Sequence, residues 1–487
     1  MADSEAPPTR PGQRDLTAGP IASTLLAFAL PTLGSNILQS LNGSINAIWV
    51  GRFLGEDALA GTGNANTIMF LMFGMVFGFG MAATILVGQS FGRRDVDSAR
   101  RAFGSAIGLV LAASLVVATL GWVFTRDILE ALATPPSALD DAFAYLRVMF
   151  ASLPAQMATV LMFMGLRGSG DSLTPLRFMA LTVVLDAALN PVLILGLGPV
   201  PALGIAGSAA ATLIAGAATA IGLAAYIHGR DLPIRLKGAE LRYVLPEARL
   251  TRTIVAKGLP IGAQMIVISV AGLAMFGLVN RLGVHTAAGY GVTLQMWAYV
   301  QMPALAIGAA VSAMAAQNIG AGKWDRVGEI TRAGLAYNLL LTGAMVGVLL
   351  LFDRQILGLF VGGGSPALPI AEHINALATW GFVLFGATMV LFGVVRANGA
   401  VWGPLLILFI AMFPIRLGFA AALQPALGSD ALWWSFPIGS AANVIGAALY
   451  YRYGPWRRAA LSVPGEDECE KRAQASAEPT GTLRPAA

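Results

Sequence analysis

The sequence predicts an all-α membrane protein with about twelve transmembrane helices in two six-helix lobes. Composition is the first reason, because 56% of the 487 residues are hydrophobic and 12% are charged. Soluble domains carry roughly 25% charged residues, and a soluble globule of this length could not bury so much apolar sequence. The second reason is a series of long apolar stretches, and the third is an internal repeat.

The apolar stretches have the length of membrane-spanning helices, which need about 20 residues to cross the hydrocarbon core. They form two sets of six, at 21–50, 58–88, 102–124, 143–166, 175–197 and 204–227, and at 254–282, 286–316, 333–352, 374–395, 403–423 and 431–451. Pro31 and Pro260 lie inside long stretches and are expected to kink them.

The two sets of stretches define the domains that we expect. We predict a disordered cytoplasmic tail at 1–20, a first lobe at 21–227, a cytoplasmic linker at 228–253, a second lobe at 254–452 and a solvated cytoplasmic tail at 453–487. The first twenty residues lack the apolar core and cleavage site of a secretory signal peptide. The single cysteine, Cys469, provides neither a disulfide framework nor a thiolate metal site.

Positive charges predict the orientation in the membrane, since Lys and Arg gather on the cytoplasmic side. With the N-terminus in the cytoplasm, only six of the 31 Lys and Arg residues fall outside the cytoplasmic segments. These are Arg52, Arg126, Arg281 and Arg354 in the outer loops, and Arg147 and Arg416 within spans. The net charge of +5 therefore reflects topology, and nucleic-acid binding is not expected.

An internal repeat relates the two halves of the chain. Segments 30–98 and 259–326 align at an offset of 229, which falls to 228 after a single-residue gap. The matching pairs include Pro31 and Pro260, Gly80 and Gly308, Gln89 and Gln317, and Gly92 and Gly320. Six helices per half is an even number, so both halves enter the membrane in the same direction. This predicts a pseudo-two-fold axis along the membrane normal.

Several segments together resemble the multidrug and toxic compound extrusion (MATE) family. They are ALPTLGSNILQSLNGSINAIWVGRFLGEDALAG, VGQSFGRRDVDSARR, RGSGDSLTPLRF and AAQNIGAGKWDR, and the resemblance covers about residues 20–455. It implies twelve helices in two six-helix lobes that form a V. It also implies export of cationic, lipophilic compounds coupled to the entry of protons or sodium ions.

Asp186 is the candidate coupling residue. It is the only one of the 26 Asp and Glu residues in the middle of a predicted span. Ionisable groups are costly in lipid, so a carboxyl group at this depth is a functional candidate by default, and it could exchange a proton near neutral pH. Asn190 follows one helical turn later on the same face. The alternative is a structural Asp that is hydrogen-bonded to neighbouring helices.

The first predicted span carries a polar stripe that could provide partners for this carboxyl group. Asn36, Gln39, Asn42 and Asn46 recur at spacings of three and four residues. Such amides must face protein or water in a bilayer. We interpret Asn46 as part of the coupling site and the other three as lining a substrate cavity. The alternative is that the stripe only joins helices by hydrogen bonds.

The chain departs from the pattern that the resemblance implies. Bacterial members with a proton site in the first lobe have Asp near the outer end of helix 1, and Asn followed by Asp four residues later on helix 5. Here Asn46 occupies the first position, and Asp186 and Asn190 are exchanged. The branch that places Glu on helix 7 is not matched, because Ile268 and Ser269 stand there. A proton site with altered partners is therefore expected rather than a sodium site.

Two further residues are candidates for the substrate cavity. Arg416 lies within a span, one position beyond the repeat equivalent of Asp186, and could pair with an acid or favour an anionic ligand. The alternative is an Arg that reaches the membrane interface or a backbone carbonyl. Met72 belongs to a run of Met and Phe side chains that suits varied apolar ligands, although packing explains such a run equally well.

The expected function is transport rather than catalysis. The sequence contains no phosphate-binding loop and no nucleophile–base constellation, so neither ATP hydrolysis nor another enzymatic activity is expected. We expect a monomeric antiporter in a bacterial inner membrane that exports drug-like molecules in exchange for protons by alternating access. We expect no cofactor and no bound metal, and we expect the proton gradient to drive transport. Sodium-coupled export, a flippase for a lipid-linked precursor and a non-transporting membrane scaffold remain as alternatives.

Overall fold

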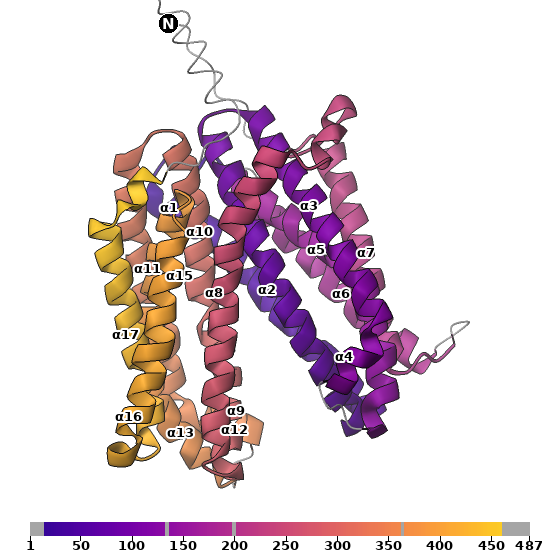
Figure 1. The fold of residues 1–487 in the computed structure, drawn as a ribbon, viewed down its shortest axis with the longest axis vertical. Coiled ribbons are helices and arrows are strands. Elements are labelled where there is room, and N and C mark those ends of the chain that lie inside the picture. Colours follow the sequence, from indigo (N-terminus) through magenta and orange to yellow (C-terminus); the bar gives the residue numbers. More distant parts are fainter. Residues whose placement is uncertain (1–13, 132–135, 197–200, 362–364, 460–487) are drawn as a thin grey trace, which may run out of the picture.

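The computed structural model describes residues 14–131, 136–196, 201–361 and 365–459, and the secondary structure within these ranges is helical (Figure 1). Two lobes meet at the end of the molecule that carries the described chain termini and diverge toward the other end, as a V (Figure 1). We call the first the terminal end. The lobes correspond to the two halves of the chain.

The first lobe contains six long helices and one short connecting helix. They are α1 (Ile21–Leu54), α2 (Glu56–Gly92), α3 (Val96–Val123), α4 (Thr125–Ala131), α5 (Pro136–Gly168), α6 (Leu173–Leu195) and α7 (Ile205–Gly229). Each of the six predicted spans of this half coincides with one of the long helices, and three of them overrun its end by one or two residues. Pro31 lies inside α1, which remains continuous.

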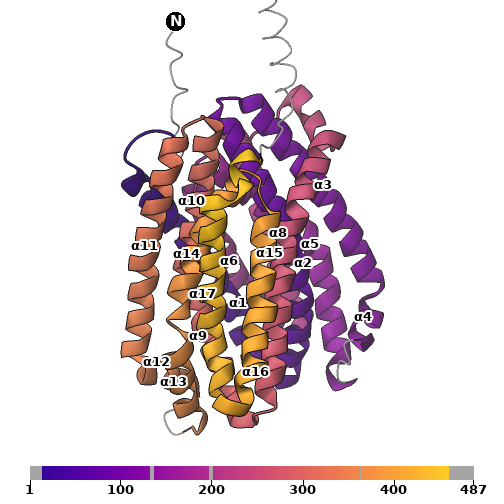
Figure 2. The ribbon, with the colours of Figure 1, turned by 60° about the vertical axis from the view of Figure 1, so that its left-hand side comes forward.

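The second lobe is more interrupted than the first. Its elements are α8 (Ala248–Asn280), α9 (Val284–Val300), α10 (Met302–Gly320), α11 (Trp324–Leu351), α12 (Asp353–Val361), α13 (Ala367–Ala378), α14 (Gly381–Ala397), α15 (Trp402–Ile410), the π-helical turn η2 (Ala411–Leu417), α16 (Gly418–Leu427) and α17 (Asp430–Tyr453). Figure 2 shows α17 beside α15 on the outer side of this lobe.

Three predicted spans of the second half are present but are not regular helices throughout. The stretch 286–316 is interrupted at Gln301, two residues before Pro303, which has no N–H to continue the helical ladder. The stretch 374–395 bends by 46° between α13 and α14. The stretch 403–423 contains η2 with Pro414, where the hydrogen bonding changes from an α to a π pattern.

The number of spans agrees with the sequence prediction. In the described part of the chain, nine helices are long and apolar enough to cross a membrane, or ten when the bent α13–α14 pair counts as one span. Two more helices have the length of a span but are not among these nine or ten: α2 with 37 residues and α17 with 24 residues. They lie within the bundle, α2 against α5 and α8, and α17 against α14.

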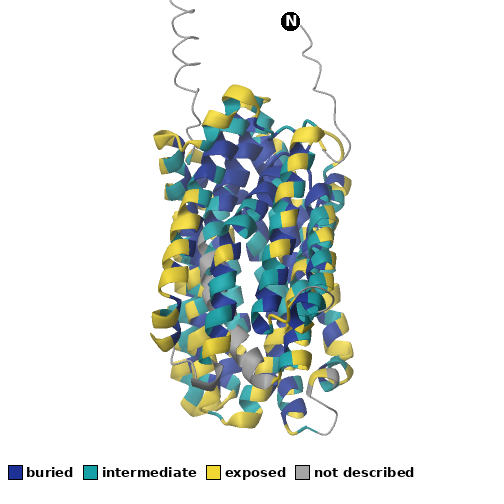
Figure 3. Ribbon diagram, turned by 90° about the vertical axis from the view of Figure 1, so that its right-hand side faces the viewer, coloured by how far each residue is buried: buried dark blue, intermediate teal, exposed yellow. Residues whose placement is uncertain are grey.

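Burial follows the pattern of a membrane bundle. Buried residues fill the interior, and exposed residues run along the outer faces (Figure 3). Large apolar side chains on those faces, such as Leu120, Val184 and Ile221, are more than half exposed in the isolated chain. In a bilayer these side chains meet lipid, which removes the cost of their exposure.

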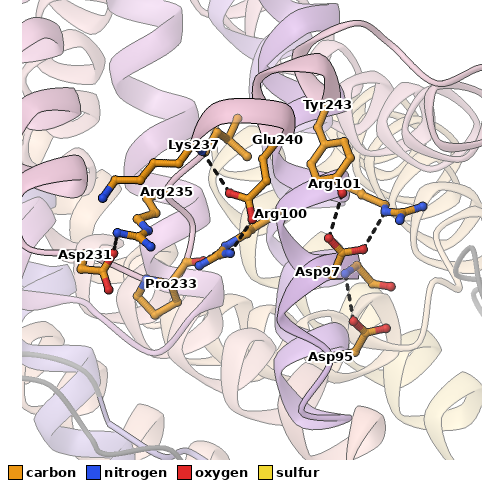
Figure 4. Close-up of polar contacts among 12 residues, drawn as sticks. Asp95, Asp97, Arg100, Arg101, Asp231, Pro233, Arg235, Lys237, Glu240 and Tyr243 are labelled. Carbon is orange, nitrogen blue, oxygen red and sulfur yellow. Dashed lines mark hydrogen bonds and ion pairs between the residues drawn. The ribbon is translucent and has the colours of Figure 1, made fainter.

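The linker between the lobes folds back onto the first lobe. Its 3-10 helix η1 (Gly238–Val244) packs on α3, where Glu240 pairs with Arg100 at 2.7 Å and the Tyr243 hydroxyl donates to Asp97 at 2.9 Å (Figure 4). Gly108 on α3 permits this approach, because a Cβ at that position would overlap the Val244 carbonyl.

Both expected tails are partly ordered, which corrects the prediction for residues 14–20 and 453–459. Leu16 is fully buried against the second lobe, and Asn318 donates to its carbonyl at 2.9 Å. Trp456 in η3 (Pro455–Arg458) is also buried, and Asn398 donates to its carbonyl at 2.8 Å. Both segments are polar in overall composition, but each contains one large apolar side chain, Leu16 or Trp456, whose burial holds the segment in place. Residues 1–13 and 460–487 lie outside the described ranges.

Two equivalent glutamines join the lobes at the terminal end. Gln89 on α2 donates to the carbonyl of Ala397 at the end of α14 at 2.7 Å, and Gln317 on α10 donates to the carbonyl of Gly168 at the end of α5 at 2.9 Å. Both glutamines are buried. The donors are repeat equivalents, as are the acceptors, so the two bonds are related by the pseudo-two-fold axis. We call this pair of bonds the glutamine latch.

A pair of equivalent glycines brings the lobes close enough for the latch. A Cβ on Gly92 would lie 1.9 Å from the Gln317 carbonyl oxygen, and one on Gly320 would lie 2.0 Å from that of Gln89. Helices α2 and α10 therefore touch backbone to backbone at this point, which only glycine permits. This contact closes the terminal end of the space between the lobes.

Candidate functional site

The candidate site is centred on Asp186 in the first lobe. Asp186 lies in the middle of α6 and is fully buried between α1 and α7. It is the only carboxylate in the middle of a spanning helix within the described ranges. The depth and burial on which the sequence prediction rests are therefore both present.

Three amides surround the Asp186 carboxylate. Asn42 and Asn46 on α1 donate from Nδ2 to Oδ2 at 2.8 and 3.0 Å. Asn190, one turn along α6, donates from Nδ2 to Oδ1 of Asp186 at 3.1 Å and to the side-chain Oδ1 of Asn46 at 2.9 Å. The amide of Asn46 thus contacts both the carboxylate and Asn190, and the group forms one connected network.

A hydroxyl group from a third helix completes the network. Thr212 on α7 donates toward Oδ1 and Oδ2 of Asp186 at 3.3 and 3.4 Å, and toward the Ser208 carbonyl at 3.3 Å. These long distances make Thr212 a weaker partner than the amides. We call Asp186, Asn42, Asn46, Asn190 and Thr212 the carboxylate cage.

Every donor in the carboxylate cage is neutral. In the described part of the chain, Asp186 has no basic partner and forms no ion pair. A buried carboxylate without a counter-charge is held at a high desolvation cost, which hydrogen bonds offset only in part. The arrangement is therefore suited to accept a proton or a cationic group.

Two acceptor atoms in the cage have no donor. The side-chain Oδ1 atoms of Asn42 and Asn190 are buried and unpaired in the described structure. Leaving such atoms unsatisfied is unfavourable, so each is a place where a bound proton donor or cation would be stabilised. The residues could also supply hard oxygen ligands to a small cation, although no described group of three or more His, Cys, Asp or Glu side chains forms a metal site.

The structure brings some of the predicted site residues together and leaves others apart. Asp186, Asn190 and Asn46 meet as expected, and Asn42 joins them instead of only lining a cavity. Asn36 is partly exposed and Gln39 is exposed on α1, and neither contacts the carboxylate by a hydrogen bond. The predicted role of Met72 falls outside the described side chains.

Thr212 is the cage residue that the sequence reasoning missed. A signal was present, because Ser208, Thr212 and Thr219 share one face of α7 at spacings of four and seven residues. The structure shows that this face meets α6, since the Thr219 and Thr182 hydroxyls are 2.8 Å apart. A hydroxyl stripe in a small-residue helix is a weaker signal than an amide stripe, because small residues also pack helices together.

Arg416 in the second lobe lies apart from the carboxylate cage. Its guanidinium carbon is 3.7 Å from the centre of the Phe436 ring, and its Nη1 is 3.5 Å from the sulfur of Met412. Its Nε is buried and has no hydrogen-bond partner. The pairing with an acid that the sequence left open is not present among the described residues.

Comparison with protein families and known proteins agrees with the fold. The MatE family model matches residues 31–192 and 260–421. The two matched segments have the same length and are 229 residues apart, which confirms the internal repeat. Together the two matches of the MatE family model cover more than half of the chain.

Relatives of similar length extend across the whole bundle. The probable multidrug resistance protein YoeA of Bacillus subtilis is 32% identical over 433 residues, which are 88% of this chain and 93% of YoeA. The probable multidrug resistance protein YpnP of the same organism is 29% identical over 444 residues, 91% of this chain and 97% of YpnP.

Solved structures show the same fold. The structure "Outward-facing conformation of a multidrug resistance MATE family transporter of the MOP superfamily" matches with a TM-score of 0.83 and 20% sequence identity, covering 93% of this chain and 98% of that chain. At this identity the likeness establishes the fold.

Proposed function

The chain belongs to the MatE family of membrane transporters, and we propose that it is a proton-coupled antiporter that exports lipophilic cationic compounds. The names of YoeA and YpnP, probable multidrug resistance proteins, support a drug-like substrate. The observation that carries the proposal is the buried Asp186 carboxylate with only neutral donors. A group of this kind changes its charge when it takes up a proton.

The exchange follows from competition for one carboxylate. The deprotonated cage attracts a cationic compound, and protonation of Asp186 removes the charge and weakens that hold. Coupling requires the shared site to favour different conformations in its two states. In the proposed cycle, the protonated state releases the compound outward, and loss of the proton to the cytoplasm restores the site.

We place the terminal end in the cytoplasm of a bacterium and the protein in its inner membrane, as a monomer. Basic residues at this end support the orientation, among them Arg100 and Arg101 on α3 and Arg242 in η1. With this orientation, the glutamine latch closes the cytoplasmic side, and the lobes diverge toward the outside. The structure then corresponds to an outward-facing state.

Sodium coupling is the second candidate, and the unpaired oxygens of Asn42 and Asn190 favour it. Transport into proteoliposomes separates the two. Ethidium, a permanent cation, should accumulate when the lumen is acidic, and it should not respond to an outward sodium gradient at equal pH. Asp186→Asn should abolish the accumulation. Asp430→Asn is the matched control, because Asp430 pairs with His373 at an exposed end of the second lobe.

Three outcomes would contradict the proposal. Accumulation driven by sodium alone would replace protons with sodium as the coupling ion. Proton-driven accumulation that survives in a well-folded Asp186→Asn protein would remove Asp186 from the mechanism. A lack of transport under both gradients would favour the scaffold alternative.

A further inference from the structure

Arg416 places a positive charge near the middle of the span Trp402–Leu427. A charged group at that depth is costly, and it is beyond the reach by which Arg side chains extend to a membrane interface. In the described part of the chain, no carboxylate pairs with it. The interface role that the sequence left open therefore does not account for this residue.

The π-helical turn η2 explains the position of Arg416 in the repeat. In the first lobe Asp186 follows Pro175 by eleven residues, and in the second lobe Arg416 follows the equivalent Pro404 by twelve. A π turn closes its hydrogen bonds over five residues instead of four, so it takes up one extra residue. With η2 at 411–417, Arg416 returns to the helix face that Asp186 occupies on α6.

The surroundings of Arg416 lack the partners that Asp186 has. The repeat equivalents of Asn42 and Asn46 are Ala271 and Met275, which are buried and apolar. No acceptor from α8 therefore neutralises the guanidinium. The first lobe holds its charge in a cage of donors, whereas the acceptor that the described second lobe offers to Arg416 is one weak one, the Met412 sulfur.

The second lobe instead supports the guanidinium with an aromatic ring. Arg416 lies over Phe436, and the Phe436 ring in turn contacts Trp297 with centroids 4.7 Å apart. Gly439 lets the side chain pass, because a Cβ there would lie 3.0 Å from that of Arg416. One face of the guanidinium is covered, and the residue keeps partial exposure. Nη1 reaches the Met412 sulfur, a weak acceptor, whereas Nη2 has no hydrogen-bond partner among the described residues and remains for an anion.

We propose that Arg416 binds the carboxylate of an aromatic substrate, so that the transported compounds are amphoteric. This inference rests on the proposed function, since it assigns the cationic group of the same substrate to Asp186. The pseudo-two-fold axis places Asp186 and Arg416 at equivalent positions and therefore at similar depth in the two lobes. A compound with a positive group at one end and an acidic group at the other matches this pair of charges.

Binding of two fluorescent dyes to the purified full-length protein tests the proposal without any ion gradient. The first dye is a rhodamine with a free carboxylate, and the second is its methyl ester. Arg416→Met should weaken binding of the acid about tenfold or more, as expected for loss of a charge-assisted contact, and should change binding of the ester by less than about twofold. Arg416→Lys should retain part of the preference for the acid.

Arg147→Met is the matched control, because Arg147 also lies over an aromatic ring, 3.5 Å from the centre of Trp122, but belongs to the first lobe. It should alter neither dye's affinity. Equal binding of the acid by wild type and Arg416→Met, including no binding by either, would overturn the proposal. Equal weakening of both dyes would overturn it too, since it would assign Arg416 a structural role. If Arg416→Met does not purify, Arg416→Gln answers the same question.

The dye-binding test of Arg416 and the transport test of proton antiport can fail independently of each other. If Arg416→Met binds the acid as well as wild type does and proton-driven ethidium transport is intact, this inference alone is removed. A preserved, Arg416-dependent preference in a protein that shows no antiport would remove the proposed coupling and keep the anion site.

Discussion

The amides around Asp186 can serve both protonation states of its carboxyl group. Each Asn side chain carries a donor and an acceptor at the same end, and rotation by 180° exchanges them. With Asp186 ionised, Asn42, Asn46 and Asn190 donate to it. With Asp186 protonated, a rotated amide could accept the acid hydrogen. Asp and Asn are exchanged relative to the family pattern, but the site can still hydrogen-bond to the carboxyl group in both its ionised and its protonated form.

A second carboxyl group, outside the spans, predicts a pH-dependent stability. Burial raises the pKa of Asp353 from 3.8 to about 6, although Asn375 donates to it at 2.8 Å and partly opposes the shift. The folded protein therefore binds more protons than the unfolded chain between roughly pH 4 and 6, and stability falls as the pH rises through this range. Above it, the ionised group remains destabilising.

Asp353→Asn should remove this dependence. We expect the variant to melt at a higher temperature than wild type at neutral pH and at a similar temperature near pH 4, because Asn resembles the protonated acid. Melting curves of the detergent-purified protein against pH provide the measurement. If the melting temperatures of wild type and variant differ by the same amount at both pH values, Asp353 is not the source of the pH dependence.

At the scale of single residues, the sequence predicts the buried carboxyl group of Asp186 but misses one of its hydrogen-bond partners. Asp186 is identifiable because a mid-span acid is rare and costly. Asn46 and Asn190 follow from helical spacing. Thr212 does not, because its contact depends on how α6 and α7 pack, and its hydroxyl is typical of small-residue helices. The helix face on which Arg416 lies is also not predicted, because it depends on a π turn, which cannot be recognised from the hydrophobic periodicity of the sequence.

At the scale of elements, the glutamine latch is the most specific contact between the lobes. Gln89 and Gln317 match in the sequence repeat, but their acceptors are backbone carbonyls, which carry no side-chain signal. The repeat therefore predicts equivalent glutamines without predicting that each one crosses to the other lobe. The interruptions in the second lobe are likewise local effects that an apolar stretch does not reveal.

Removal of the latch should favour opening at the terminal end. In Gln89→Leu/Gln317→Leu the two inter-lobe bonds are lost, and each is worth roughly 0.5–1.5 kcal/mol. The sum would shift the equilibrium between closed and open terminal ends roughly 5- to 150-fold. Distances between spin labels at the exposed Arg230, directly after α7, and the exposed Arg332 on α11 measure the change.

The control for the latch is a glutamine within one lobe. Gln156 donates to Ser152 on the same helix, α5, so Gln156→Leu should leave the distance distribution as in wild type. A double latch variant with the wild-type distribution would show that the bonds do not hold the terminal end closed.

At the scale of the whole molecule, two lobes of one design carry opposite charges at equivalent positions. The even number of helices per half makes the repeat parallel, and rocking of one lobe against the other is the motion that such a repeat permits. The sequence predicts this architecture well, because span length and repeat offset are chain-wide signals. The ordered terminal segments are not predicted, since single buried residues such as Leu16 and Trp456 anchor them.

The orientation of the molecule is a prediction at this scale. The linker at 228–253 should lie in the cytoplasm, so a single cysteine at the exposed Leu241, in a Cys469→Ser background, should not react with an impermeant reagent in intact cells. The same cysteine should react in inverted membrane vesicles. Labelling in intact cells would reverse the orientation and with it the direction of export.

Proton release on substrate binding is the measurement that tests the central claim most directly. In weakly buffered detergent solution near neutral pH, ethidium should displace up to about one proton per bound cation from the wild-type protein, because the cation and the proton compete for Asp186. Asp430→Asn should behave as wild type. A folded Asp186→Asn protein should bind ethidium more weakly and release no proton, and proton release from that variant equal to wild type would contradict the account.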